Sequence, residues 1–112
     1  MPTKADRFSP DLVAVATRAQ TLSHPARLKI LRVLARHDRC ICGDIVEALP
    51  LAQATVSRHL KALREAGLVS VEQDGPRSCY CLRTDALRRL SADLSGFLAP
   101  LLADEPLPTD GC

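Results

Sequence analysis

The sequence predicts a mainly α-helical winged helix-turn-helix with a small β-hairpin, in one domain of residues 1–103. A short apolar segment ending at Pro50 precedes a longer amphipathic segment, 53–66, which is typical of a helix-turn-helix. Two short apolar strands then flank a turn at 74–76, as in a hairpin. Leucines at helical spacing come after the hairpin. The expected order is therefore helix, helix, short strand, short helix, helix, two strands, helix.

Length and composition bound the class of protein. The chain has 112 residues, of which 46% are apolar and 25% charged, which is the balance of a globular protein. No apolar stretch approaches the roughly 20 residues that span a bilayer, and no apolar signal region follows Met1. Transmembrane, secreted and collagen-like proteins are therefore excluded, and we expect a cytoplasmic location.

Charge is unevenly distributed along the chain. Residues 1–83 carry 13 Lys/Arg against 8 Asp/Glu, a net of +5, whereas residues 84–112 carry 2 against 5, a net of −3. A basic body with an acidic end is compatible with binding a polyanion, and equally with ordinary solvated charge.

Start signals and apolar spacing define the first two helices. The first is expected to begin at 9–11. Its apolar stripe comprises Leu12, Val15, Ala16, Ala19 and Leu22. The second opens with Ser23 as the expected N-cap and Pro25 in the first turn, and 37–39 ends it. Its expected apolar face comprises Leu28, Ile30, Leu31, Val33 and Leu34.

The next two helices form the helix-turn-helix. A short helix over 44–49 is stopped by Pro50, and helix 53–66 ends at Gly67, a favourable C-terminal cap. The inward positions of the longer helix are Val56, Leu60 and Leu63.

The C-terminal third contains the hairpin and a last helix. The strands are expected at 68–72 and 79–83, and 84–85 caps a helix reaching residue 102. Its stripe comprises Leu87, Leu90, Leu94, Leu98 and Leu101. Residues 104–112 are expected to form a flexible tail.

The polar face of helix 53–66 is suited to a DNA major groove. Its side chains are Gln53, Thr55, Ser57, Arg58, His59 and Lys61. Gln and Arg can pair bidentately with adenine and guanine, and Ser, Thr and Lys reach bases or phosphates. Arg77, at the hairpin tip, can reach a phosphate or a minor groove. The bland alternative is a solvated helix face and a solvated turn residue.

With these elements in place, the chain resembles the ArsR/SmtB family of metal-sensing winged-helix repressors. The matching segments are Leu-Ser-His-Pro-Ala-Arg-Leu-Lys-Ile-Leu (22–31), Asp-Ile-Val-Glu-Ala-Leu (44–49), Gln-Ala-Thr-Val-Ser-Arg-His-Leu-Lys-Ala-Leu-Arg-Glu-Ala-Gly-Leu-Val (53–69) and the wing. The resemblance covers 12–102. It implies a homodimer, joined through 12–22 and 85–102, which docks on an inverted repeat of operator DNA and leaves when a metal or metalloid binds. Ala52 departs from the family, which often has a capping Ser there.

The cysteines depart from the family pattern too. Arsenite repressors of the family carry Cys-Val-Cys-Asp-Leu, whose cysteines would align with Ile41 and Gly43, whereas this chain has Cys40 and Cys42. On a strand, residues i and i+2 share a face. If 39–42 pairs with 79–82, four thiols face one way together, opposite the core-facing Ile41, Tyr80 and Leu82. The candidate ligands are Cys40, Cys42, Cys79 and Cys81, with Cys112 as a further thiol.

Soft thiolates select soft ions, so we expect As(III) or Sb(III) with three sulfurs, or Cd(II) or Zn(II) with four. The pattern Cys-Ile-Cys with a later Cys-Tyr-Cys also resembles an arsenic-responsive branch of the family. The last helix has no His, which argues against the family's other zinc site. His24 and His37 are scattered and are read as structural or exposed.

Several alternatives stay open on the sequence alone. Thiols this close could form a redox switch, small cysteines could simply be buried in a strand, and Cys112 could be an idle terminal thiol. A structural zinc module is another possibility. An enzyme is not expected, because the chain has neither a Cys-x-x-Cys at a helix start nor a phosphate loop.

Overall fold

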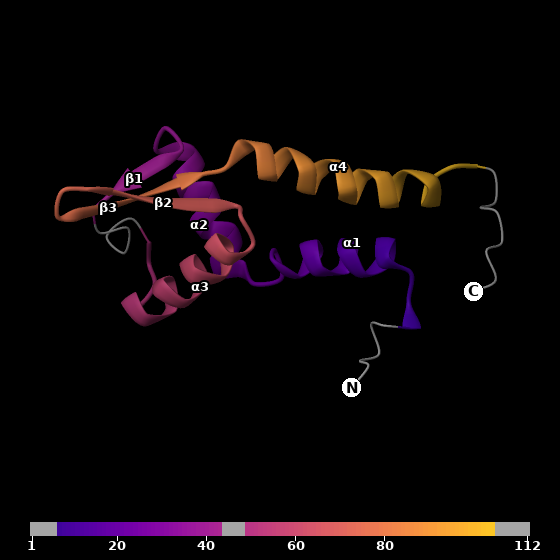
Figure 1. Cartoon of the computed structure of the whole chain (residues 1–112), viewed down its shortest axis with the longest axis horizontal. Helices are drawn as coiled ribbons and strands as arrows, with labels where there is room; N and C mark the ends of the chain where they lie inside the picture. The colour runs from indigo at the N-terminus through magenta and orange to yellow at the C-terminus, as the bar shows by residue number, and fades with distance from the viewer. Residues whose placement is uncertain (1–6, 44–48, 105–112) are drawn as a thin grey trace.

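The computed structural model describes residues 7–43 and 49–104, and within them the chain forms four helices and one three-stranded sheet. The elements in order are α1 (Pro10–Gln20), α2 (Pro25–Arg36), β1 (Cys40–Cys42), α3 (Gln53–Glu65), β2 (Val69–Asp74), β3 (Arg77–Leu82) and α4 (Thr84–Leu101). Helices α1 and α4 lie side by side and extend away from a body made of α2, α3 and the sheet (Figure 1). The winged helix-turn-helix prediction is confirmed. The predicted short helix at 44–49 falls almost wholly outside the described residues, as does the tail beyond residue 104.

The helix starts follow the capping signals, with two corrections. Ser9 caps α1 by accepting the N–H of Leu12, so this helix starts where it was predicted to start. The N-cap of α2 is His24, not Ser23: Nδ1 of His24 accepts the N–H of Ala26 at 3.0 Å. Ser23 lies one residue too early, because the carbonyl of His24 accepts the first helical bonds, from the N–H groups of Arg27 and Leu28.

The start of α4 also differs from the prediction. The N-cap position is occupied by Arg83, and no side chain caps the helix. The Arg83 guanidinium instead contacts Asp85 at 3.4 Å and, by donating to the carboxylate, lowers the pKa of Asp85. Thr84 and Asp85 are therefore already helical.

The two ends of α3 differ in how well they are capped. At the C-terminal end Gly67 has φ +81°, a conformation that glycine adopts without a Cβ penalty. Its N–H bonds the carbonyl of Arg64, and the N–H of Leu68 bonds that of Leu63. At the N-terminal end Ala52 has the extended conformation of an N-cap but no side-chain acceptor. Because the first backbone N–H groups of α3 lack this side-chain acceptor, a capping residue at position 52 should stabilise the helix.

Replacing Ala52 with Ser is expected to raise the free energy of unfolding by about 1 kcal/mol, which is about 4–8 °C in thermal midpoint. The new hydroxyl would accept the N–H of Thr55, at the third position of α3. Thermal unfolding followed by circular dichroism measures the shift. Ala54→Ser, at the second residue of α3, is the matched control and should not stabilise the protein. An unchanged midpoint in A52S would show that the helix start is already satisfied.

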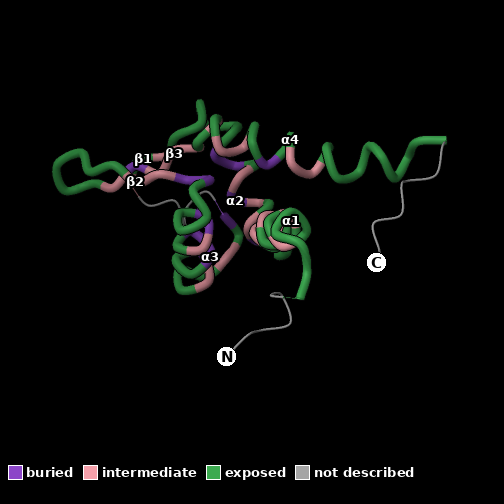
Figure 2. Tube along the Cα trace, turned by 45° about the vertical axis from the view of Figure 1, so that its right-hand side comes forward, coloured by how far each residue is buried: buried purple, intermediate pink, exposed green. Residues whose placement is uncertain are grey.

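The sheet places β3 between β1 and β2, and both pairings are antiparallel. β2 and β3 pair from Val69↔Leu82 to Asp74↔Arg77, so the hairpin extends two residues further toward its tip than predicted. The two-residue turn begins at Gly75, whose φ is +62°, and continues through Pro76. This hairpin is the wing, and it projects beyond the helices (Figures 1 and 2).

The core lies where α2, α3 and the base of the wing meet. Its largest fully buried side chains are Ile30, Leu34, Val56, Leu63 and Val69. Leu28, predicted on the inner face of α2, is 47% exposed, because it lies about 200° round the helix from Ile30. Helix α1 has no buried residue, and α4 has only Leu90 (Figure 2). The α1–α4 arm therefore adds little to the core of one chain.

Candidate functional site

The exposed face of α3 carries most of the predicted DNA-reading side chains. Gln53, Ser57, Arg58 and Lys61 are exposed and Thr55 is half-buried. Helix α3 and the wing tip both lie at the end of the molecule remote from the free ends of α1 and α4 (Figure 1). No carboxylate lies in the first turn of α3, so its positive dipole end is left open to an anion.

His59 does not belong to this face, which corrects the sequence prediction. It is 7% exposed and is the one buried polar residue among those described. Nε of Arg27 donates to its Nδ1 at 3.2 Å, and the rings of His24 and His59 are 4.2 Å apart. His59 follows Val56 by three positions and precedes Leu63 by four, so helical spacing places it on the inner stripe. The reading set therefore loses this residue.

The surroundings of His59 predict a loss of stability in acid. Burial, followed by the nearby His24, Arg27 and Arg58, lowers its pKa from the ordinary 6.5. Between the folded-state pKa and 6.5 the unfolded chain binds more protons, so stability present above pH 6.5 is lost as the pH falls through the folded-state pKa. Urea unfolding at about pH 7.5 and about pH 5.5 should show a larger loss for wild type than for His59→Phe. An equal loss in wild type and H59F would contradict the assignment.

Arg77 lies at the start of β3, directly after the wing turn. Its side chain is 62% exposed, and Nη2 lies 4.0 Å from the exposed carboxylate of Asp74. An exposed pair at this distance contributes little stability, so the guanidinium stays available to a phosphate.

The four described cysteines come together as the strand pairing predicted. β1 pairs with β3 in the register Cys40↔Cys81, Ile41↔Tyr80 and Cys42↔Cys79. The facing Cα atoms are 4.1 Å apart in the first cysteine pair and 3.9 Å in the second, and each pair forms a disulfide. Cys112 lies outside the described residues. The sequence pattern therefore predicts the cluster of four, although it leaves the state of the sulfurs open.

The cysteines occupy one face of the sheet, and the alternate residues face the core. Ile41, Tyr80 and Leu82 pack against the buried cluster. Cys40 and Cys42 on the edge strand are exposed, whereas Cys79 on the central strand is 7% exposed. The register also places Ser70 and Glu72 of β2 opposite Cys81 and Cys79, on the cysteine face. The sequence prediction missed these two, though strand alternation could have found them.

Backbone bonds hold β1 to the wing on either side of the cysteines. The N–H of Leu82 bonds the carbonyl of Arg39 at 2.8 Å, and the N–H of Gly43 bonds that of Ser78 at 3.0 Å. With the sulfurs joined in two pairs, the described part of the chain holds no group of three or more His, Cys, Asp or Glu side chains placed to hold a metal ion. Thiolates rather than disulfide sulfurs are metal ligands, so these four cysteines could bind a metal or metalloid only after reduction.

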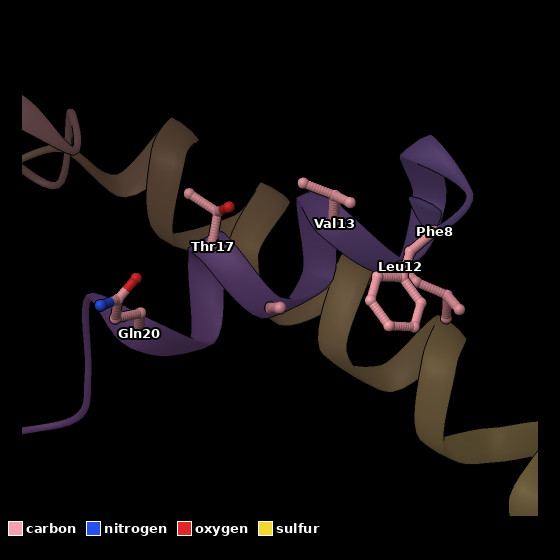
Figure 3. A pocket seen from close by; sticks show the side chains of 6 residues that line it. Phe8, Leu12, Val13, Thr17 and Gln20 are labelled. Carbon is pink, nitrogen blue, oxygen red and sulfur yellow. The ribbon is translucent and has the colours of Figure 1, made fainter. Parts of the chain in front are cut away.

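The outer side of α1 forms an apolar hollow rather than a catalytic pocket. It is lined by Phe8, Leu12, Val13, Ala16, Thr17 and Gln20 (Figure 3). Phe8 and Leu12 lie next to each other at its N-terminal end and are 60% and 48% exposed. None of the lining side chains is ionisable, so the hollow has the character of a contact surface.

Comparison with known proteins agrees with this geometry. The sequence model described as "Bacterial regulatory protein, arsR family" matches residues 24–71, from the N-cap of α2 into the wing. The biofilm growth-associated repressor of Agrobacterium fabrum is 37% identical over 87 residues, 77% of this chain and 74% of that protein. The chain belongs to the ArsR family. It is accordingly a transcriptional regulator of the repressor type and not an enzyme.

Two further proteins are similar to this chain over most of its length. The arsenical resistance operon repressor of Staphylococcus xylosus is 32% identical over 80 residues, 71% of this chain and 76% of that protein. The solution structure of the homodimeric winged helix-turn-helix DNA-binding domain of a possible ArsR-family regulator from Mycobacterium bovis aligns with a TM-score of 0.58 and 25% identity. That alignment covers 97% of this chain and 100% of the M. bovis domain. Within the described residues, no helix combines the length and apolar character needed to cross a membrane.

Proposed function

We propose that this ArsR-family chain is a homodimeric repressor that binds an inverted-repeat operator and is released by As(III) or Sb(III). The exposed side chains of α3 would enter the major groove, and Arg77 of each wing would contact a phosphate or the adjacent minor groove. The proposed reading set is Gln53, Thr55, Ser57, Arg58 and Lys61, all exposed or half-buried on one helix. An inverted repeat follows from the two-fold symmetry of a homodimer.

One observation carries the choice of inducer: two cysteine pairs face each other across β1 and β3, on one face of the sheet. When reduced, these pairs offer four thiolates at the base of the wing. Thiolates are the preferred ligands of soft ions. The similarity to an arsenical resistance operon repressor supports the same choice.

The four thiolates suit a metalloid that is bound by three sulfurs. One cross-strand pair supplies two thiolates. A neighbour two residues along the same strand starts about 6.6 Å away along the chain, so its side chain would have to turn toward the pair to supply the third. Cd(II) or Zn(II) would take all four sulfurs, at bonds of about 2.3 Å for zinc. Glu72, opposite Cys79, could give an oxygen ligand to Zn(II) but would not suit As(III). Cys112 remains a proposed further ligand.

The site lies at the base of the wing, in the sheet that packs against α3 through β2, which gives a route from ligand to DNA. β1 is already joined to β3 by backbone bonds, so a ligand would reshape an existing pairing rather than create one. β3 continues into the wing and β1 leads toward α3. A coupling of about 1–3 kcal/mol between the two sites would weaken operator binding about 5–150-fold.

A thiol-redox repressor is the second candidate, and the disulfide pairing favours it. Two thiols of a pair would transfer two electrons and two protons to an oxidant such as hydrogen peroxide, giving one S–S bond and two water molecules. The exposed Cys40 is the accessible first target, whereas Cys79 is buried.

One experiment separates the two candidates. The full chain selects duplexes from a random-sequence library, and the selected duplex is then used as the anisotropy probe. The protein is reduced under anaerobic conditions and titrated with As(III), Sb(III), Cd(II) and Zn(II), and in a separate arm with hydrogen peroxide. Release by As(III) or Sb(III) in the absence of oxidant supports the proposal. Release by peroxide alone supports the redox repressor, and selection of no duplex would refute operator binding.

A further inference from the structure

A polar junction of His24, Arg27 and His59 lies where α1, α2 and α3 meet. Arg27 Nε donates to Nδ1 of His59 at 3.2 Å, and its Nη1 donates to the carbonyl of Gln20, the last residue of α1, at 3.3 Å. The ring of His24 lies against that of His59. A single guanidinium on α2 thus reaches both the first and the third helix.

The environment of His59 makes this contact specific. Its ring is buried, and because Nδ1 accepts from Arg27, the ring proton must reside on Nε2. A buried acceptor that loses its donor bears the full cost of desolvation. The Arg27 bond therefore favours one position of the inner face of α3 against α2.

The second hydrogen bond of Arg27, to Gln20, links that position of α3 to α1. Helix α1 has no buried residue, so packing alone holds it weakly to the body. Within the described residues, Arg27 is the side chain whose hydrogen bonds connect α1 with α3. The carbonyl it contacts lies at the C-terminal end of α1, where the helix dipole favours a cation.

We propose that Arg27 is a positioning residue for operator binding. Because it donates hydrogen bonds to both Gln20 and His59, it fixes the orientation of α3 relative to α1. In a dimer joined through α1 and α4, this orientation sets the distance between the two α3 helices, and so the half-site spacing that the protein accepts. The inference rests on the proposed homodimeric operator binding.

The test uses Arg27→Lys in the full chain, with the duplex selected by wild type as the probe. Lys keeps the charge, but its single ammonium lacks the planar fork that spans two acceptors. We expect binding about tenfold weaker, as for loss of a charge-assisted hydrogen bond. Arg32→Lys, an exposed position on the same helix, is the matched control and should bind as wild type. His59→Phe should reproduce the loss, and His59→Gln, whose amide oxygen can accept, should restore part of it.

Half-site spacing distinguishes positioning from simple stability. Wild type and variants are compared on the selected duplex and on duplexes with one base pair added to or removed from the centre. Wild type should discriminate strongly, whereas in R27K the ratio of affinities should move toward one. Partial unfolding lowers the active fraction equally for every duplex, so it cannot change this ratio.

An unchanged ratio in both R27K and H59F would overturn the inference even if both variants bound more weakly. Selection of no duplex by wild type would instead overturn the proposed function, and the inference with it.

Discussion

Replacing Cys40 and Cys42 together with Ser is expected to abolish release by As(III) while leaving operator binding close to that of wild type. Both cysteines are exposed on the edge strand, and the core-facing residue between them, Ile41, is unchanged, so the substitution should leave the fold intact. It removes one member of each cross-strand pair, so no pair of facing thiolates remains. As(III) could then no longer bind sulfurs from both β1 and β3.

The measurement is anisotropy of the selected duplex with reduced protein and increasing As(III). Wild type should weaken about 5–150-fold, and the double variant should not respond. Cys112→Ser is the control, since release that persists in this variant shows that the β1–β3 cluster suffices. If the C40S/C42S protein were still released by As(III), the inducer would bind elsewhere, and the proposed site would be wrong.

The cysteine cluster could be predicted because strand geometry is periodic. Once Ile41, Tyr80 and Leu82 were assigned to the core, alternation forced the intervening cysteines onto the opposite face. The pairing state of the sulfurs could not be predicted, because a disulfide and a dithiol ligand site need the same register. The turn that starts β1 also lacked a signal: Asp38 and Arg39 both have positive φ, which is uncommon for non-glycine residues.

His59 shows the opposite kind of failure, since the signal was present and was missed. Its polarity suggested the DNA face, whereas its spacing from Val56 and Leu63 indicated the core. What the sequence could not show was the compensation: a buried imidazole is tolerated here because Arg27, 32 positions earlier, supplies its hydrogen bond. Such long-range pairs have no periodic signature. The misplaced N-cap of α2 is a smaller case, because His24 is not among the usual capping residues.

Replacing Leu98 with Glu is expected to prevent dimerisation and to weaken operator binding at least about 100-fold. In one chain the outer half of α4 is unusually apolar and exposed: Phe97, Leu98 and Leu101 are 40%, 51% and 52% exposed. Arg18 and Asp93, 2.8 Å apart, hold α1 beside this helix. The arm therefore presents exposed apolar side chains, which a second copy would bury in the proposed homodimer. A charge buried there without a partner opposes association.

Two measurements on L98E establish the cause. Sedimentation equilibrium should show a monomer. That monomer should still show a thermal unfolding transition of a folded body, because Leu98 lies outside the buried core. Affinity falls because two linked half-site contacts become two separate binding events, and a linked second contact can contribute about 10²–10⁴ in affinity. Ala99→Glu, an exposed position about 100° further round the helix, adds the same charge and should remain dimeric. A dimeric L98E protein, or a monomer that binds the full operator as wild type does, would show that the α1–α4 arm is not what joins the two α3 helices in the dimer.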